Sequence, residues 1–322
     1  MKALYLSDNG LELRTDCPMP RPQPNEALIR VLCAGICSTD LEIVRGYNPH
    51  RGILGHEFVG IVEAAADTDW IGRRAVGGIN LGCQTCAVCT QSGPEHCPNR
   101  RVLGILGKDG VFADYITLPL TNLLPVPDSV PDDMAVFTEP LAAALRITEQ
   151  LDVTIRSATA HRVAAVVGPG RLGLLISQVL ALTGLAVTVV GRSEASLVLP
   201  RSLGMETAPV HEVGDDAFDL VVEATGNDQG LAAALRMLRP LGTLVLKSTY
   251  AGTANVNLTK LVVAEITVIG SRCGPFAPAL RLLSQGQIQV EPLVDGRYPL
   301  ADGLQAFAHA ARPGVRKILL YP

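Results

Sequence analysis

A glycine-rich turn near the middle of the chain constrains the fold more than any other feature. It follows an apolar run at residues 162–167 and precedes a run with helical spacing at 171–183. Glycines spaced in this way permit a tight turn, a close approach of the backbone to a pyrophosphate, and close packing of the helix on the strand. Amide groups at the helix start then face the phosphates. The turn therefore predicts a dinucleotide site formed by Gly168, Pro169, Gly170, Arg171, Leu172 and Gly173.

Strands and helices are predicted to alternate around this turn. Expected strands lie at 162–167, 186–190, 218–222, 243–246 and 266–269, and expected helices at 171–183, 193–203 and 230–238. This order predicts an α/β domain with a doubly wound parallel sheet and helices on both faces, the Rossmann arrangement. Residues 172–190 carry no charge and are long enough to be considered as a membrane span. Their change to a β-branched run at 187–190 instead favours a buried helix followed by a buried strand.

The residue at the end of the second strand bears on which dinucleotide is bound. An Asp or Glu at this place would accept hydrogen bonds from the ribose hydroxyls of NAD. The chain has Gly191 there, followed by Arg192 and Ser193. A guanidinium and a hydroxyl suit a 2′-phosphate, and no carboxylate is present to repel it. We therefore predict NADP, with NAD as the second choice. In the alternative interpretation, Glu194 supplies the acid and Arg192 is a solvated surface charge.

Length and composition favour a globular protein with two domains. The chain has 322 residues, which is more than a single core usually spans. With 48% hydrophobic and 18% charged residues, it can bury enough apolar surface to offset the entropy of ordering. The formal net charge of −4 offers no basic excess to a nucleic acid or an anionic membrane, so small-molecule partners are expected. No apolar segment typical of a signal peptide follows Met1, so a cytoplasmic protein is expected.

The residues outside the alternating region have a different pattern. The first 130 residues are rich in Gly, Pro and short alternating runs, for example at 27–34 and 58–63, which are typical of short strands. A helical segment at 140–147 leads into the alternating region. The tail from about residue 275 is expected to form a helix at 277–284 and a closing strand at 317–321.

A cluster of cysteines predicts a metal site. Four of the eight cysteines lie within residues 83–97, and four thiolates so close together would hold a tetrahedral zinc with no open position, which is typical of a structural site. His96 is adjacent and could also ligate. A bacterial ferredoxin cluster is an alternative, but its fourth cysteine follows after three residues, not seven. The predicted ligands are Cys83, Cys86, Cys89 and Cys97, whereas Cys17, Cys33 and Cys273 are expected to be packing residues.

Three segments far apart in the sequence carry further candidate ligands. They are Gly-Ile-Cys-Ser-Thr-Asp at 35–40, Gly-His-Glu at 55–57 and Glu-Pro-Leu at 139–141. A thiolate, an imidazole and a carboxylate could hold a catalytic zinc and leave one place for water or substrate. Taken singly, however, Cys37 is more often a small buried hydrophobe, and His56 is more often a structural histidine.

Together, these motifs resemble those of zinc-dependent medium-chain dehydrogenases, in the branch of alcohol, polyol and threonine dehydrogenases. They occur in the family's order over nearly the whole chain. The resemblance implies a GroES-like, partly open β-barrel catalytic domain at 1–143 and 275–322, with a zinc lobe at about 80–100. It also implies a Rossmann domain at 144–274, an active site in the cleft between the domains, and a homodimer or homotetramer.

The resemblance implies which side chains hold the catalytic zinc. Cys37 and His56 correspond to two ligands, and Glu57 and Glu139 compete or alternate as the carboxylate. A glutamate at the place of Glu139 is typical of the polyol branch, where liver-type alcohol dehydrogenases have a cysteine.

The same resemblance implies roles for the residues that follow Cys37 in the sequence. Asp40 resembles the carboxylate that accepts the second ring N–H of the histidine ligand. Thr39, or less favourably Ser38, resembles the hydroxyl that relays the substrate proton. Without the resemblance, Asp40 and Thr39 could equally cap a helix that starts at Leu41.

The implied activity is hydride transfer between NADP(H) and a secondary alcohol, a polyol, or the matching ketone or aldehyde. Zinc would stabilise the alkoxide while Thr39 hands on the hydroxyl proton. Glu42 stands where some members of the family have a histidine, and the run at 62–66 lacks an expected glycine. The resemblance therefore does not assign the route by which the proton leaves. The alternatives are a zinc-free quinone or enoyl reductase of the same fold and a non-enzymatic protein that senses redox state through its cysteine lobe.

Overall fold

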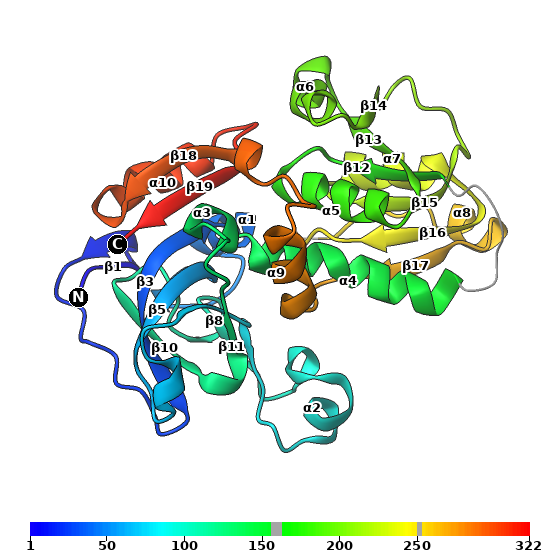
Figure 1. Ribbon diagram of the computed structural model, residues 1–322. Helices are drawn as coiled ribbons and strands as arrows, with labels where there is room; N and C mark the ends of the chain where they lie inside the picture. The colour runs from blue at the N-terminus through cyan, green and yellow to red at the C-terminus, as the bar shows by residue number, and fades with distance from the viewer. Residues whose placement is uncertain (156–162, 250–252) are drawn as a thin grey trace. The chain divides into compact units, whose positions relative to one another are not determined.

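The computed structural model describes residues 1–155, 163–249 and 253–322, and these divide into two compact units (Figure 1). Unit 1 comprises Met1–Glu139 and Phe276–Pro322, and unit 2 comprises Pro140–Pro275. The first residue of the strand expected at 162–167 lies outside the described residues. No helix within the described ranges is long and apolar enough to cross a membrane.

Unit 2 contains a six-stranded parallel sheet. Its strands, in spatial order, are β14 (Glu206–Pro209), β13 (Ala186–Gly191), β12 (Val163–Val167), β15 (Phe218–Glu223), β16 (Leu238–Leu246) and β17 (Thr267–Gly270). In chain order this is the 3-2-1-4-5-6 arrangement of two mononucleotide-binding halves. The predicted doubly wound sheet is therefore confirmed.

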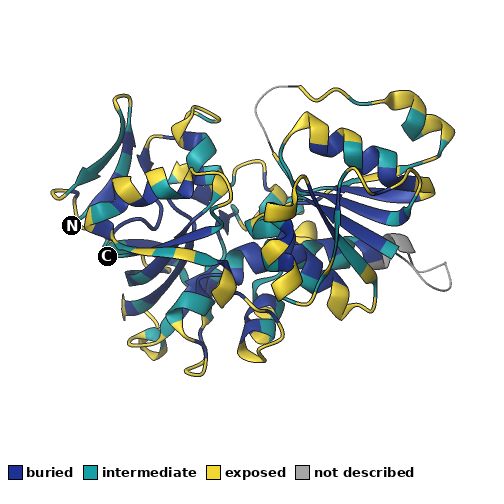
Figure 2. Ribbon diagram, turned by 90° about the horizontal axis from the view of Figure 1, so that it is seen from above, coloured by how far each residue is buried: buried dark blue, intermediate teal, exposed yellow. Residues whose placement is uncertain are grey.

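Helices cover both faces of this buried sheet (Figure 2). The helices of this unit are α4 (Thr138–Ile155), α5 (Arg171–Leu182), α6 (Glu194–Ser202), α7 (Asp228–Met237) and α8 (Leu258–Val263). The uncharged stretch at 172–190 forms most of α5 and β13, as the change in its spacing predicted. The sequence did not predict β14 or α8, because both are short and β14 has a polar, Pro-containing sequence.

Unit 1 is built around a seven-stranded sheet. Its path is β11 (Leu123–Pro125), β6 (Arg74–Gly77), β5 (Glu57–Ala64), β3 (Glu26–Ile36), β19 (Lys317–Tyr321) and β18 (Val294–Pro299), with β10 (Tyr115–Pro119) also paired to β3. Two small sheets accompany it, formed by β1 (Ala3–Ser7), β2 (Gly10–Arg14) and β4 (Gly52–Ile53), and by β7 (Asn80–Leu81), β8 (Arg101–Leu103) and β9 (Gly107–Lys108). The many short strands expected in this region are present.

The C-terminal tail completes the main sheet of unit 1. The predicted helix and closing strand are present as α9 (Phe276–Ser284) and β19, and β19 pairs with β3. The sequence did not predict β18 or α10 (Gly303–Ala310), which lie between them. Strand β18 alternates between half-buried and exposed residues and contains glycine and proline, so its sequence does not read as a core strand.

Candidate active site and metal centres

The order of strands in unit 1 brings two of the sequence motifs together. Strand β3 ends at Ile36, directly before Cys37, and β5 begins at Glu57, directly after His56. The two strands pair antiparallel with Gly35 opposite Glu57. Because this register places the end of one strand beside the start of the other, Cys37 and His56 are neighbours in space.

Asp40 connects the two motifs through its two carboxylate oxygens. Oδ2 accepts the backbone N–H of Cys37 at 2.8 Å, and Oδ1 lies 3.1 Å from Nδ1 of His56. Asp40 is fully buried. Helix α1 (Ser38–Val44) thus begins at Ser38, so the expected start at Leu41 is wrong. Thr39 and Asp40 lie inside this helix and are not its N-cap, which is Cys37. Asp40 is its third residue and accepts the backbone N–H of Cys37, and it also contacts His56.

The contact with Asp40 determines which nitrogen of His56 is free. A carboxylate at Nδ1 holds the ring proton there and leaves Nε2 for a metal. Burial lowers the pKa of His56, but the charge and hydrogen bond of Asp40 more than offset this, so that the pKa lies well above its usual value. A metal ion at Nε2 would therefore release a proton on binding.

One atom from each of Cys37, His56 and Glu57 forms a group that could hold a metal ion. The sulfur, the ring nitrogen and the carboxylate oxygen all lie within 4.8 Å of one another. The Cys37 thiol donates to the Thr39 hydroxyl oxygen at 3.8 Å, so Thr39 also lies at this group. Glu139 is half-buried in the first turn of α4 and is not a member of the group of three.

The donors of this group fit a zinc ion. Glu57 uses Oε2 for a buried ion pair with Lys317 Nζ, whereas Oε1 is buried and accepts no hydrogen bond from the described residues. An unpartnered buried carboxylate oxygen beside a thiol and an imidazole is the environment that a cation would complete. When bound, zinc would polarise the oxygen of an alcohol or a carbonyl and lower the pKa of the alcohol.

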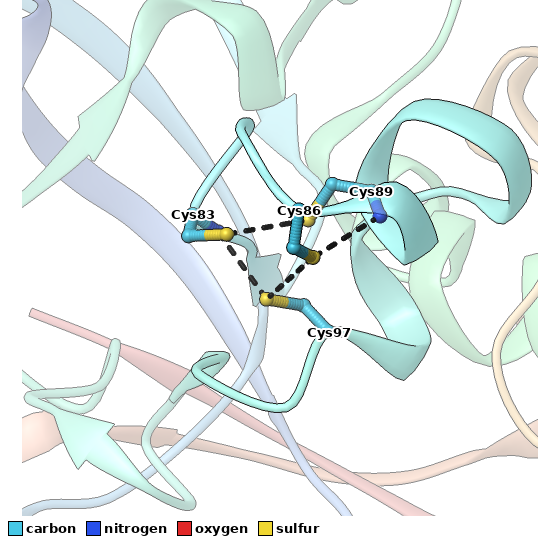
Figure 3. A group of neighbouring side chains, drawn as sticks. All are labelled: Cys83, Cys86, Cys89 and Cys97. Atoms are coloured by element: carbon cyan, nitrogen blue, oxygen red, sulfur yellow. Dashed lines mark hydrogen bonds between the residues drawn. The ribbon is translucent and has the colours of Figure 1, made fainter.

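The four-cysteine lobe brings its predicted ligands together (Figure 3). Their four sulfurs lie within 4.8 Å of one another, and His96 is not a member of this group. The sulfurs of Cys86 and Cys97 are 3.8 Å apart, and the backbone N–H of Cys83 donates to Cys97 Sγ at 3.4 Å. Cys86 caps α2 (Ala87–Ser92), which contains no buried residue. A metal ion would thus stabilise this lobe, because its small helix has no hydrophobic core to hold it in place.

Different surroundings act on the thiols of the lobe. Hydrogen bonds from the Thr85 hydroxyl and the backbone lower the pKa of Cys83 to about 6. Burial raises the pKa of Cys89 to about 12. The four cysteines are therefore not all deprotonated on their own, and a bound cation would displace the protons of those that are still thiols. Of the other cysteines, Cys17 and Cys33 are buried, as expected of packing residues, and Cys273 is half-buried.

The three glycines of the turn in unit 2 have different surroundings, so each is needed for a different reason. Gly168 has φ +109°, and a Cβ there would lie 2.8 Å from the Ala224 carbonyl oxygen. A Cβ at Gly173 would collide with the Gly168 carbonyl oxygen. Gly170, which precedes α5, has open space around it. The first and third glycines thus serve packing, and the second leaves the backbone open to a ligand.

Strand β13 ends at a glycine that lies close to two side chains of α6. A Cβ at Gly191 would lie 2.5 Å from Ser196 Oγ and 2.7 Å from Leu197 Cδ2. Arg192 is exposed beyond the strand end. Glu194 lies in the first turn of α6 and forms an exposed ion pair with Arg201 at 2.6 Å.

Two family models cover most of the chain. Residues 23–128 match the alcohol dehydrogenase GroES-like domain, and residues 132–313 match the glucose dehydrogenase C-terminus. A sorbitol dehydrogenase of Halalkalibacterium halodurans is 29% identical over 356 aligned positions, which cover 100% of this chain and 99% of the relative. The chain belongs to the zinc-dependent medium-chain dehydrogenase family. It is accordingly an oxidoreductase that uses zinc and a nicotinamide cofactor to act on CH–OH groups. The zinc-free and non-enzymatic alternatives are therefore not retained.

Solved structures of this family have the same fold. A zinc-binding dehydrogenase of Sinorhizobium meliloti 1021 bound to NADP has a TM-score of 0.89 at 27% identity. An alcohol dehydrogenase of Escherichia coli CFT073 in complex with NADH has a TM-score of 0.89 at 25% identity. Each alignment covers 100% of this chain and 99% of the other chain. The GroES-like and Rossmann parts expected from the sequence are therefore confirmed.

Sequence reasoning missed one residue beside the metal-binding group. Lys317 pairs with Glu57 although 260 positions separate them. The available signal was a lysine at the start of an otherwise apolar strand, Lys-Ile-Leu-Leu-Tyr at 317–321, because a buried cation requires a buried partner.

Proposed function

We propose that this protein transfers a hydride between NADP(H) and a secondary alcohol or polyol, or the matching ketone. The observation that carries the proposal is the group of Cys37, His56 and Glu57, with Asp40 behind the histidine. The polyol class is supported by the 29% identity with a sorbitol dehydrogenase. Loops that line a binding site generally vary more than the elements they connect, so the proposal is limited to this class.

We further propose roles for the residues of the group. Cys37 and His56 hold the catalytic zinc, with Glu57 and Glu139 alternating as the carboxylate. Asp40 keeps Nδ1 of His56 protonated and the ring oriented. Thr39, whose hydroxyl lies at the Cys37 sulfur, accepts the proton of the substrate hydroxyl and passes it on. In the lobe, Cys83, Cys86, Cys89 and Cys97 hold a second, structural zinc.

The preference for NADP is proposed from the end of β13. The residues of the glycine turn, 168–173, would hold the pyrophosphate. Gly191 supplies no acid at the strand end, and Arg192 with Ser193 would bind the 2′-phosphate. The ion pair of Glu194 with Arg201 argues against Glu194 as the ribose-binding acid. The NADP-bound relative and the NADH-bound relative are similar to this chain to nearly the same degree, and binding measurements with both cofactors test the preference.

We propose that the two units are functional domains, with the catalytic domain at 1–143 and 275–322 and the nucleotide-binding domain at 144–274. We also propose that the chain is a homodimer or homotetramer. Strand β17 is at the edge of its sheet, and Val268 on it is exposed. Leu258, Val262 and Val263 of α8 are exposed nearby. An apolar edge of this kind favours pairing with another copy.

The test combines zinc content with activity. The purified protein should contain close to two zinc ions per chain and should oxidise members of a polyol and secondary-alcohol library with NADP. Cys37→Ala should lose one zinc and nearly all turnover, because the remaining ligands cannot hold the ion. Cys17→Ala, which changes a buried cysteine outside both groups, is the control. Unchanged turnover in Cys37→Ala would refute the assignment of the catalytic zinc.

A further inference from the structure

A buried ion pair adjoins the proposed catalytic metal group. Lys317 Nζ donates to Glu57 Oε2, and each side chain is only 1% exposed. The ammonium also lies 5.5 Å from the ring centre of Phe137. Removing two charges from water is costly, so a pair buried to this degree needs a good geometry. The ion pair therefore holds the Glu57 carboxylate in a defined position.

The ion pair crosses a strand at a glycine. Strand β3 lies between β5, which carries Glu57, and β19, which carries Lys317. Gly35 on β3 is opposite Glu57 on one side and Leu319 on the other. A Cβ at Gly35 would collide with Glu57 Oε2 and would lie 3.3 Å from Lys317 Cδ. The missing side chain thus provides the space in which lysine and glutamate meet.

The two oxygens of Glu57 have different surroundings. Oε2 is bound to Lys317, and Oε1 accepts no hydrogen bond from any described residue. Glu57 is also a member of the group whose ligand atoms lie within 4.8 Å of one another. A cation at this group and the Lys317 ammonium would therefore both attract the same carboxylate.

We infer that Lys317 is a positioning residue for the catalytic metal: by holding Glu57 across Gly35, it restrains the carboxylate from closing on the ion and keeps a place there open for the substrate oxygen. The inference rests on the proposed assignment of the metal to Cys37 and His56. Without the ammonium, the site has one more negative charge, so Glu57 becomes a permanent ligand. The ion is then held more tightly, and the alcohol must displace a carboxylate.

Lys317→Met tests this inference in the zinc-loaded enzyme. We expect release of the catalytic zinc to a coloured chelator to be slower by about tenfold or more, because a unit positive charge near the ion is lost. In the cobalt-substituted enzyme, the visible d–d absorption should weaken as a four-coordinate ion gains a ligand. KM for the alcohol should rise more than kcat falls. Lys317→Arg, which keeps the cation, should restore wild-type values.

Two further variants keep the inference testable if Lys317→Met folds poorly. Gly35→Ala changes no charge but pushes Oε2 away from Lys317, so it should slow zinc release in the same direction, by a smaller factor. Lys317→Met combined with Glu57→Gln removes both charges and should return release to near the wild-type rate. The control is Lys108→Met, which breaks the largely buried pair of Lys108 with Glu26 outside the metal group and should leave zinc release unchanged.

The outcomes separate this inference from the proposed function. If Lys317→Met and Gly35→Ala release zinc as fast as wild type or faster, the pair has only a structural role and the inference is wrong. If Cys37→Ala retains both zinc ions, the proposed metal site itself is wrong. Slower release in the Lys317 and Gly35 variants, together with loss of one zinc in Cys37→Ala, supports both.

Discussion

At the scale of single residues, Asp40 illustrates how one carboxylate can serve two elements. One oxygen accepts the N–H of Cys37 at the start of α1, and the other faces His56 before β5. Because the residue is fully buried, both contacts operate without competition from water. Asp40 therefore fixes the position of the helix start relative to the histidine, and this keeps Cys37 and His56 close together.

Replacing Asp40 should loosen the metal more than the fold. In Asp40→Asn, the amide is a weaker acceptor at Nδ1 and does not hold the ring with a charge. We expect the affinity for the catalytic zinc to fall by about 10–100-fold. Competition with a chelator measures this affinity. Asp114→Asn, which removes the charge from another acceptor of a backbone N–H, serves as the control. Equal zinc affinity in both variants would contradict the role given to Asp40.

Arg192 should discriminate between the two dinucleotides. In Arg192→Ala, we expect the Kd for NADPH to rise about tenfold or more, because a charge-assisted contact to the 2′-phosphate is lost. The Kd for NADH should hardly change. Fluorescence titration of the two reduced cofactors measures both constants. Arg239→Ala, which removes a guanidinium paired with Asp219, is the matched control. A similar loss for NADH and NADPH would favour a general electrostatic effect.

At the scale of elements, β3 organises unit 1. It pairs with β5, β10 and β19, so three distant stretches of chain align on one strand. Its first residue, Glu26, is buried and paired with Lys108 Nζ at 3.1 Å, and it accepts the N–H of Gln23. Burial raises the pKa of Glu26, but these contacts outweigh burial, so that its pKa is lowered.

The lowered pKa predicts a pH-dependent stability. A carboxyl whose folded pKa is below its unfolded value of about 4.3 stabilises the fold above that pH, and this contribution disappears as pH falls through the folded pKa. Glu26→Gln should therefore be less stable than wild type by about 1–3 kcal/mol at neutral pH, and the difference should be smaller at about pH 3. Urea unfolding at the two pH values measures this. Glu42→Gln, in an exposed pair, should show little difference at either pH.

At the scale of the whole molecule, each unit has its own core and its own chemical task. The metal-binding groups belong to unit 1, and the glycine turn belongs to unit 2. Unit 2 ends its sheet at β17, where the backbone groups on one side of the strand are not paired within the sheet. The exposed fractions of Val262 and Val263 are 75% and 78%, which is unusual for apolar side chains on a surface without a partner.

A single substitution that introduces a charge can test the proposed pairing of copies at β17. Val263→Lys should shift the protein to a smaller oligomer, because an ammonium in an apolar interface loses its hydration. Light scattering after size-exclusion chromatography measures the mass. Val198→Lys on α6, where the native valine is 64% exposed, should leave the mass unchanged. If neither variant alters the mass, the proposed interface at β17 is wrong.

The sequence by itself determined the features that depend on near neighbours in the chain. The glycine turn and the alternation of strands and helices were predicted because φ preferences and apolar periodicity act over a few residues. The cysteine lobe was predicted because its four ligands lie within residues 83–97. Elements with weak periodicity, such as β18 and α10, could not be predicted, since contacts with β19 and not local preference hold them.

Only the tertiary structure decided which distant side chains meet. The sequence left Glu57 and Glu139 equivalent as carboxylates, whereas the register of β3 and β5 places Glu57 with Cys37 and His56 and leaves Glu139 outside that group. Lys317 joins Glu57 from 260 positions away because β19 lies on the other side of β3, where Gly35 leaves room. Such contacts are formed by packing, and no pattern along the chain records which partner a buried charge will find.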